Sequence, residues 1–322
     1  MLNQNIITIA LPTPFPVGDV NVYLIRGEKL TLVDCGPKTP EAWSIFREKL
    51  AENGLEENDI EQVVFTHYHP DHVGLYSYFT SPVPVVLASL EEIPYLSQQQ
   101  EFFVHRNQFY EGFYKKMGMP EEAVRFEHRK LKKYLEFSAV VHASPALYEG
   151  EEVPGLPGWT IMKTPGHSPD HLSLFHQESG IMIGGDFLLQ RISSNALIEP
   201  PPLTKRDRPK PLLQYRDSLK TAAELPITVI LPGHGLPISN SSELIEERLA
   251  QQNNRADVLW EMLAGYKTAY ELSKLLFPSI YQKEPGLTLS ETVGHLDLLE
   301  EEGRIQTEDI KGIIYYKRAE GA

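Results

Sequence analysis

The stretch THYHPDH at residues 66–72 places three imidazoles and one carboxylate within six consecutive positions, from His67 to His72. The apolar run VVF at 63–65 precedes it and predicts a buried strand. The following run VGLY at 73–76 predicts the first turns of a helix. These ligand-type side chains are therefore expected on a strand-to-helix loop, where a rigid scaffold can direct them to one point.

The spacing within this stretch favours two metal sites over one. Residues two apart in an extended segment project to the same side, so His67 and His69 can bind one ion together, at roughly 2.0–2.1 Å for zinc. The chain then turns at Pro70, so Asp71 and His72 point elsewhere. They can reach a second ion, which two-metal hydrolytic sites hold about 3.5–4 Å from the first. A surface loop of solvated histidines is the alternative, and the matching residues downstream disfavour it.

Composition and charge restrict the classes of function. A length of 322 residues allows one large domain and a small one. The net charge of −14 argues against nucleic acid and anionic membrane surfaces as partners. Cys35 is the single cysteine, so no intramolecular disulfide can form, which fits a reducing compartment. The N-terminus shows no signal-peptide pattern, and no apolar run approaches the ~20 residues that span a bilayer. We therefore expect a cytoplasmic protein. Its partner is expected to be a small-molecule substrate.

Strands and helices are expected to alternate over most of the first 240 residues. Strand-like runs stand at residues 5–11, 20–26, 30–34, 61–66, 83–88, 159–162, 172–175, 181–183 and 229–231. Amphipathic helices are predicted at residues 39–52 and 212–224. This alternation favours an α/β (α+β) fold in which helices cover the sheet.

Two segments depart from that alternation. Residues 92–147 are rich in charged and aromatic side chains and predict two or three helices, with a break at 118–122. Their aromatic residues either fill ordinary core or form a lid that lines an acyl or alkyl pocket. From about residue 241, three helices and a strand pair follow, which is the layout of a winged helix. The helices are expected at 242–264, 268–277 and 288–302, and the strands at 304–308 and 312–317.

Single ligand-type residues follow three further predicted strands. His167 and His234 each come after a strand and a Pro-Gly turn, and Asp186 ends a strand behind two glycines. Glycines there let the backbone approach closely. With the first loop they bring the ligand-type residues to seven, enough for two ions.

This pattern resembles the metallo-β-lactamase superfamily. The matching motifs are H-x-H-x-D-H at 67–72, P-G-H at 165–167, G-D at 185–186 and G-H at 233–234, in the family's order. The resemblance implies an αββα sandwich over residues 1–240, interrupted by the helical insertion 92–147. A small winged-helix-like domain would occupy residues 241–322.

The resemblance also implies a ligand set and cofactors. One ion would lie between His67, His69 and His167, and a second between Asp71, His72 and His234, with Asp186 bridging both. We expect two divalent ions, zinc foremost, with manganese or iron as alternatives because His and Asp ligands suit all three. Asp71 is the candidate catalytic residue, which would orient the nucleophile and carry its proton.

Other residues are candidates for supporting or substrate-binding roles. Asp34 is expected to steady the ligand loop through hydrogen bonds. His171 either bonds a ligand or substrate or is structural. Arg191 and Asn195, in the loop after Asp186, are substrate contacts or plain loop.

The implied function is a metal-dependent hydrolase in which a metal-activated hydroxide attacks a small-molecule thioester or ester. The Asp at 186 makes the chain similar to glyoxalase-II-like hydrolases, and the C-terminal layout resembles the lactamase-beta-like branch, which includes an endoribonuclease and fungal polyketide thioesterases. An endoribonuclease or phosphodiesterase and a lactonase are therefore the alternatives. The predicted helix 288–302 is acidic and would repel phosphates, so the C-terminal domain is expected to serve packing, a homodimer or the substrate cleft.

Overall fold

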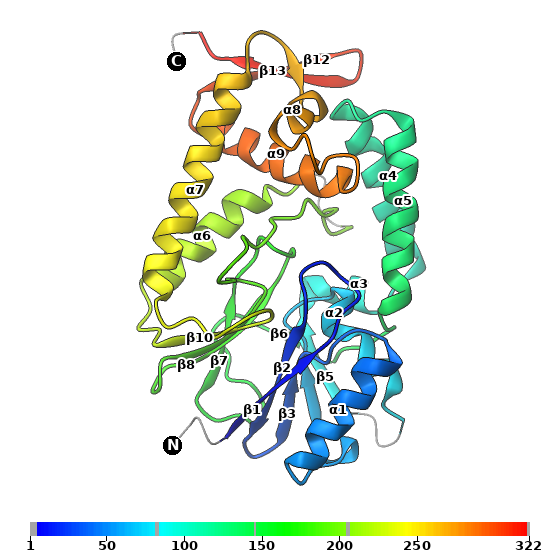
Figure 1. The fold of residues 1–322 in the computed structure, drawn as a ribbon, viewed down its shortest axis with the longest axis vertical. Helices are drawn as coiled ribbons and strands as arrows, with labels where there is room; N and C mark the ends of the chain where they lie inside the picture. The colour runs from blue at the N-terminus through cyan, green and yellow to red at the C-terminus, as the bar shows by residue number, and fades with distance from the viewer. Residues whose placement is uncertain (1–4, 81–83, 145, 204–206, 321–322) are drawn as a thin grey trace.

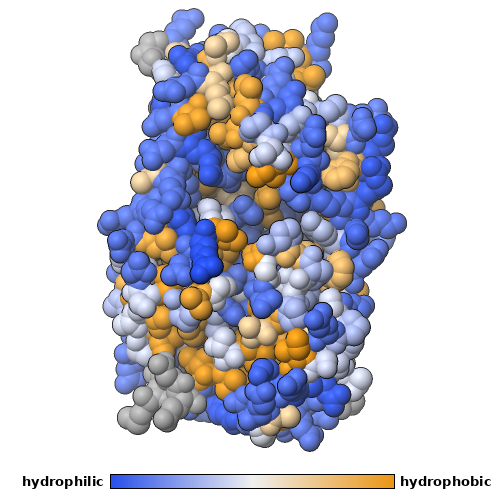
Figure 2. All heavy atoms as spheres, in the orientation of Figure 1, coloured by the Kyte–Doolittle hydropathy of each residue, from blue (hydrophilic) through white to orange (hydrophobic). Residues whose placement is uncertain are grey.

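The computed structural model describes residues 5–80, 84–144, 146–203 and 207–320. Two β-sheets lie face to face, and helices cover their outer sides (Figure 1). This is the αββα sandwich that the sequence motifs imply. On the face drawn in Figure 2, hydrophilic and hydrophobic side chains are interspersed, as on the surface of an ordinary globular protein.

The first sheet contains the strand that precedes the histidine-rich loop. Its strands, in spatial order, are β1 (Ile6–Leu11), β2 (Val20–Arg26), β3 (Leu30–Val33), β4 (Gln62–Val64), β5 (Val85–Ser89) and β6 (Ala146–Leu147). Pairing is antiparallel from β1 to β3 and parallel from β3 to β6. The parallel strands therefore end at the same edge, where their following loops can meet.

The second sheet contributes the remaining strand ends of the site. Its order is β10 (Val229–Pro232), β9 (Ile181–Gly185), β8 (Leu172–His176) and β7 (Trp159–Lys163). β10 pairs parallel with β9, and the other neighbours pair antiparallel. Consequently β7, β9 and β10 all end at one edge, and β8 begins there.

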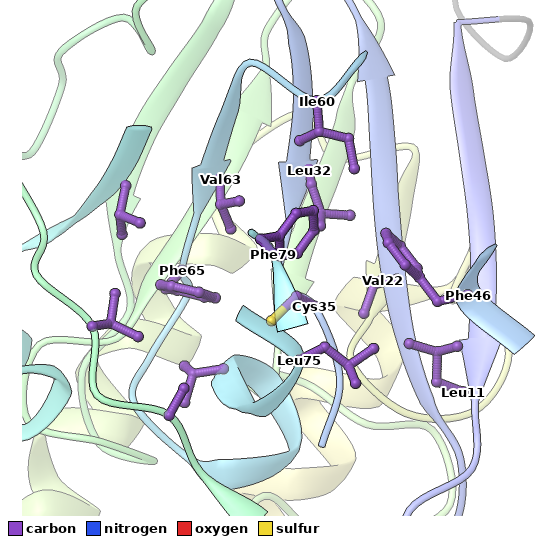
Figure 3. Close-up of a cluster of buried hydrophobic side chains, with 14 of the residues drawn as sticks. Leu11, Val22, Leu32, Cys35, Phe46, Ile60, Val63, Phe65, Leu75 and Phe79 are labelled. Atoms are coloured by element: carbon purple, nitrogen blue, oxygen red, sulfur yellow. The ribbon is translucent and has the colours of Figure 1, made fainter. Parts of the chain in front are cut away.

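Alternating side chains of the first sheet enter two different cores. In β2, Val22 and Leu24 face α1 (Pro40–Glu52), whereas Tyr23 and Ile25 face the second sheet. Figure 3 shows the outer core, where Phe46 of α1 lies near strand residues such as Val22. Strands that are buried on both faces are apolar along most of their length. This burial accounts for the mostly apolar sequence of β2, VNVYLIR.

Local chemistry sets the ends of the covering helices. Thr39 caps α1 by accepting a hydrogen bond from Ala42 N–H at 3.1 Å, and Pro40 occupies its first position. On the other side, α6 (Pro211–Ala223) and α7 (Ser241–Met262) pack on the second sheet. None of the helices in the described part of the chain combines the length and apolarity needed to cross a bilayer.

The helical insertion packs against the C-terminal segment. It comprises α3 (Ile93–Leu96), α4 (Gln100–Lys116) and α5 (Glu121–Tyr134). The C-terminal segment continues from α7 with β11 (Lys267–Thr268), α8 (Ala269–Leu276), α9 (Pro285–Glu301), β12 (Ile305–Ile310) and β13 (Ile313–Arg318). In Figure 1 the helices of the insertion stand beside α8 and α9. Tyr110, Phe113 and Tyr114 of α4 share one apolar core with Leu259 and Leu296. These aromatic residues therefore fill core, the first of the two alternatives.

Several boundaries differ from expectation for identifiable reasons. The helix after the ligand loop begins at Pro70, as α2 (Pro70–Val73), and continues as a 3₁₀ turn, Gly74–Tyr78. The last long helix begins at Pro285 instead of residue 288. In both cases proline opens the helix, because its missing N–H is not needed there. Expectations at residues 1–4, 83, 145, 204–206 and 321–322 fall outside the described residues.

Candidate metal centre

Five strand ends deliver the candidate residues to one edge of the sandwich. β3, β4, β7, β9 and β10 are followed, in that order, by Asp34, the loop from Thr66, His167, Asp186 and His234. Parallel pairing makes the ends of β3 and β4 coincide in the first sheet and those of β9 and β10 coincide in the second, and the two sheets lie face to face. Fold topology alone therefore brings together residues as distant in sequence as 34 and 234.

The first histidine group consists of His67, His69 and His167. The His67 Nε2 atom lies 2.9 Å from Nδ1 of His69, and His167 Nε2 lies 3.0 Å from that same Nδ1. Three ring nitrogens thus lie close together. A single N–H hydrogen among them could form only one of the two nitrogen–nitrogen hydrogen bonds. Such an arrangement is suited to a cation that accepts all three lone pairs.

The second group consists of Asp71, His72 and His234, and Asp186 lies between the two groups. His234 Nε2 is 3.4 Å from Asp71 Oδ2. Asp186 Oδ1 is 3.4 Å from His72 Nε2, and its Oδ2 is 3.5 Å from Nε2 of His167 in the first group. The structure therefore brings all seven ligand-type residues together, with the Asp186 carboxylate spanning both groups.

Hydrogen bonds on the outer side of the rings fix which nitrogen faces the centre. His72 Nδ1 lies 2.7 Å from the Asp34 carboxylate, and His234 Nδ1 lies 2.7 Å from the Asp19 carbonyl. His167 Nδ1 likewise lies 3.0 Å from the Asn195 carbonyl. Each oxygen can only accept, so each Nδ1 carries a hydrogen and leaves Nε2 for a ligand.

His67 is oriented through a relay. The Thr66 hydroxyl donates to Asp34 Oδ2 at 2.8 Å, so its oxygen can accept from Nδ1 of His67 at 3.0 Å. Nε2 of His67 is then free to bind a cation. The Asp34 carboxylate also accepts from the Thr66 backbone N–H at 2.9 Å, which ties the whole loop to β3.

Buried atoms without partners test whether a cation fits this site. Among the described residues, His72 Nε2, His234 Nε2 and Asp186 Oδ1 are buried and have no hydrogen-bond partner. Polar atoms that are buried in a protein usually have a hydrogen-bond partner. A divalent cation between them would satisfy all three, and His and Asp are donors that suit such an ion. The residues present fit a metal centre.

The pKa values of the histidines are shifted in opposite directions in the two groups. Burial and neighbouring imidazoles lower the pKa of His67 well below its ordinary value and that of His69 to about 3, which favours the neutral ligand form. Burial also opposes charge on His72, but Asp34 and Asp186 raise its pKa well above the ordinary value. A cation in the second group would therefore replace protons, as metal binding commonly does.

Backbone conformation at the edge is specialised. Asp34 has φ of +56°, an uncommon value for a residue with a side chain, and three hydrogen bonds to its carboxylate hold it there. At Gly233 a Cβ would lie 2.3 Å from Asp186 Oδ1. Glycine at this position lets the chain pass directly beside the Asp186 carboxylate.

The other sequence candidates occupy different places. His171 is fully buried, and its Nε2 accepts a hydrogen bond from the Asp186 backbone N–H at 3.1 Å, so it supports the bridging residue. Asn195 contributes its carbonyl to His167, and Ser194 donates to the Asp186 carbonyl. Arg191 is exposed.

Sequence reasoning missed two buried carboxylates beside the site. Glu92 accepts a hydrogen bond from the Tyr68 backbone N–H, and Glu199 accepts one from the Tyr68 hydroxyl at 2.5 Å. Glu199 also accepts one from the Tyr110 hydroxyl at 2.7 Å, which links α4 to the ligand loop. Neither glutamate lies in a recognisable motif, and local patterning carries no signal of their burial.

The fold and the site are those of a metal-dependent hydrolase. A family model described as the metallo-beta-lactamase superfamily matches residues 15–234. The chain therefore belongs to the metallo-β-lactamase superfamily.

Individual relatives agree with that assignment. The chain is 40% identical over 318 residues to the "Probable metallo-hydrolase YqjP" of Bacillus subtilis (strain 168), covering 98% of this chain and 99% of the relative. A crystal structure of a metallo-beta-lactamase family protein from Thermus thermophilus superposes with a TM-score of 0.82 at 28% identity, covering 98% of this chain and 99% of that one. An "Atrochrysone carboxyl ACP thioesterase" of Aspergillus fumigatus is 24% identical, covering 79% of this chain and 46% of the relative.

Proposed function

We propose that this metallo-hydrolase is a dinuclear enzyme that cleaves small-molecule thioesters or esters. The observation that carries the proposal is the pair of ligand groups joined by Asp186, with buried lone pairs that have no hydrogen-bond partner in the described part of the chain. Zinc is the proposed metal. Bound divalent ions would polarise the scissile carbonyl and lower the pKa of a water in the site.

The chain's own residues would order and deprotonate that water. Burial opposes ionisation of Asp71, but the neighbouring imidazoles of His234 and His72 hold its pKa below the ordinary value. The Asp71 carboxylate is therefore ionised at neutral pH and can accept a proton from that water. Asp186, held through its backbone by His171, keeps the two groups at a fixed separation.

The thioester assignment draws on chemistry and on one relative. One relative, at 24% identity, carries the name "Atrochrysone carboxyl ACP thioesterase". A net charge of −14 is unfavourable for a polyanionic substrate. Both points favour an uncharged carbonyl centre over a phosphodiester.

The position of α9 also supports a small-molecule substrate. A winged helix that reads nucleic acid needs an accessible recognition helix. Most of α9 is buried in the core that it shares with α7 and α8, and its end is acidic at Glu300, Glu301 and Glu302. The C-terminal segment thus serves packing in this proposal, and an RNA substrate is the less favoured alternative.

A substrate panel tests the proposal. Metal-loaded protein is assayed on acyl thioesters, aryl esters, homoserine lactones, bis-aryl phosphodiesters and short single-stranded RNA. We expect thioesters and esters to be cleaved and the other three classes to be turned over at least tenfold more slowly. Preferential cleavage of RNA or phosphodiesters would replace the thioesterase assignment with the nuclease alternative.

Variants show whether the site performs the reaction. His69→Ala and Asp186→Ala should each abolish turnover and reduce bound metal. His142→Ala, at an exposed position away from the site, is the matched histidine control and should keep full activity. Full activity of rigorously metal-free protein would contradict the proposal.

A further inference from the structure

A buried carboxylate outside the ligand groups joins the two loops that present the first histidine group. Glu92 follows β5 and is fully buried. Its Oε2 accepts from the Tyr68 backbone N–H at 3.1 Å, and its Oε1 accepts from the Ser168 hydroxyl at 2.7 Å and the Asp170 backbone N–H at 3.1 Å. Tyr68 separates the two loop histidines in sequence, and Ser168 directly follows the third.

The neighbours of Glu92 reinforce the same connection. The Ser89 hydroxyl donates to the Asp170 carbonyl at 2.6 Å, and the Glu91 backbone N–H donates to the Asp170 carboxylate at 3.2 Å. Lys163 pairs with that carboxylate at 2.7 Å. The segment after β5 is therefore attached to the 168–170 turn at several points, whereas Glu92 alone among these side chains also reaches the loop after β4.

We propose that Glu92 is a positioning residue for the ion of the first histidine group. It sets the distance between the loop carrying His67 and His69 and the turn carrying His167. The hydrogen bonds of Glu92 within the described residues go to the backbone and to Ser168, so it acts through these groups. This inference rests on the proposed function, because it requires that the groups bind cations.

The effect should be confined to one ion. The second group is aligned by other partners, namely Asp34 behind His72 and the Asp19 carbonyl behind His234. All three groups facing Glu92 are donors, so only a side chain with two acceptor oxygens satisfies them. Glutamine keeps one oxygen but presents an NH₂ group to a partner N–H, which must then move or remain unpaired.

Metal binding by the wild type and two variants tests the proposal. Metal-free wild type, Glu92→Gln and Ser168→Ala are titrated with Co²⁺ and Zn²⁺, with stoichiometry, affinity and the visible Co²⁺ spectrum as readouts. Zinc-soaked crystals then show which ion is lost. We expect Glu92→Gln to weaken the first-group ion by about 10–100-fold and to leave the second within a few-fold. Ser168→Ala, which removes one donor, should weaken the same ion less.

A remote buried glutamate provides the control. Glu127 of α5 is also buried and accepts a backbone N–H, from Gly286, at 3.3 Å. Glu127→Gln should lower thermal stability without changing either ion's affinity. Equal weakening of both ions in Glu92→Gln, or unchanged binding of both, would overturn the positioning role. Failure of the wild type itself to bind divalent ions would overturn the proposed function and this inference with it.

Discussion

At the scale of single residues, the site depends on what stands behind each ligand. Hydrogen bonds from Nδ1 to Asp34, Asp19 and Asn195 leave Nε2 of three histidines directed at the centre. Such partners commonly change metal affinity or activity by about 10–100-fold. The surrounding loops therefore determine where the ring nitrogens converge as much as the histidines themselves do.

Gly233 offers a prediction at this scale. In Gly233→Ala the new Cβ would lie 2.3 Å from Asp186 Oδ1, so the bridging carboxylate must move. Because small misplacements in a site cost about 100-fold, turnover should fall by roughly that factor. Activity and metal content of purified protein check this.

A glycine with free space nearby provides the comparison. Apart from its chain neighbours and the backbone of its own helix, no described residue has a heavy atom within 4 Å of a Cβ added at Gly112, which is exposed on α4. Gly112→Ala should retain activity and gain about 0.5–1 kcal/mol in stability, since alanine suits a helix interior better. Normal turnover in Gly233→Ala would show that the bridging position of Asp186 is not needed.

At the scale of elements, the helical insertion is joined to the ligand loop. The Tyr110 hydroxyl on α4 and the Tyr68 hydroxyl in the loop donate to the two oxygens of Glu199. Tyr68 in turn stacks on Tyr95, with ring centroids 4.1 Å apart. The insertion therefore supports the site from outside, in addition to sharing a core with the C-terminal helices.

Removing one hydroxyl measures this connection. Tyr110→Phe leaves one oxygen of the buried Glu199 without that donor, which should reduce the free energy of unfolding by about 1–3 kcal/mol. Chemical denaturation gives the value. The exposed pair of Tyr266 and Glu308, at 2.7 Å, is the matched control, and Tyr266→Phe should change stability by less than about 0.5 kcal/mol. Equal small effects would mean that the insertion is not anchored through Glu199.

At the scale of the whole molecule, the sandwich and the C-terminal segment are joined by an ion pair between a half-buried arginine and a buried aspartate. Arg208, ahead of α6, donates to both oxygens of Asp297 on α9, at 2.8 and 2.5 Å. The Asp297 side chain is 4% exposed. Loss of its cation would leave a buried charge without its partner.

Arg208→Ala is therefore expected to cost about 3–5 kcal/mol of stability. The neighbouring pair of Lys210 and Glu300 is 37% and 40% exposed, so Lys210→Ala should cost only about 0–1 kcal/mol. Thermal and denaturant unfolding of the two variants give the comparison. If both variants lost equally little, α9 would be held by apolar packing alone.

Sequence and structure agree most closely where the hydrophobic pattern is strong. The strands around 20–26 and 172–175 and the helix at 39–52 lie within a residue or two of their predicted bounds. Motif residues at strand ends meet because parallel pairing makes those ends coincide. By contrast, β6 and β11 span two residues each, too few to show a period. Glu92 and Glu199 depend on burial between distant segments, which no local pattern encodes.

Anomalous diffraction from crystals grown with zinc would locate the ions in the two ligand groups. We predict two peaks about 3.5–4 Å apart, one between His67, His69 and His167 and one between Asp71, His72 and His234. The Asp186 carboxylate should lie between the peaks. A zinc-grown crystal without anomalous density among these side chains, or with zinc bound only elsewhere on the protein, would contradict the account.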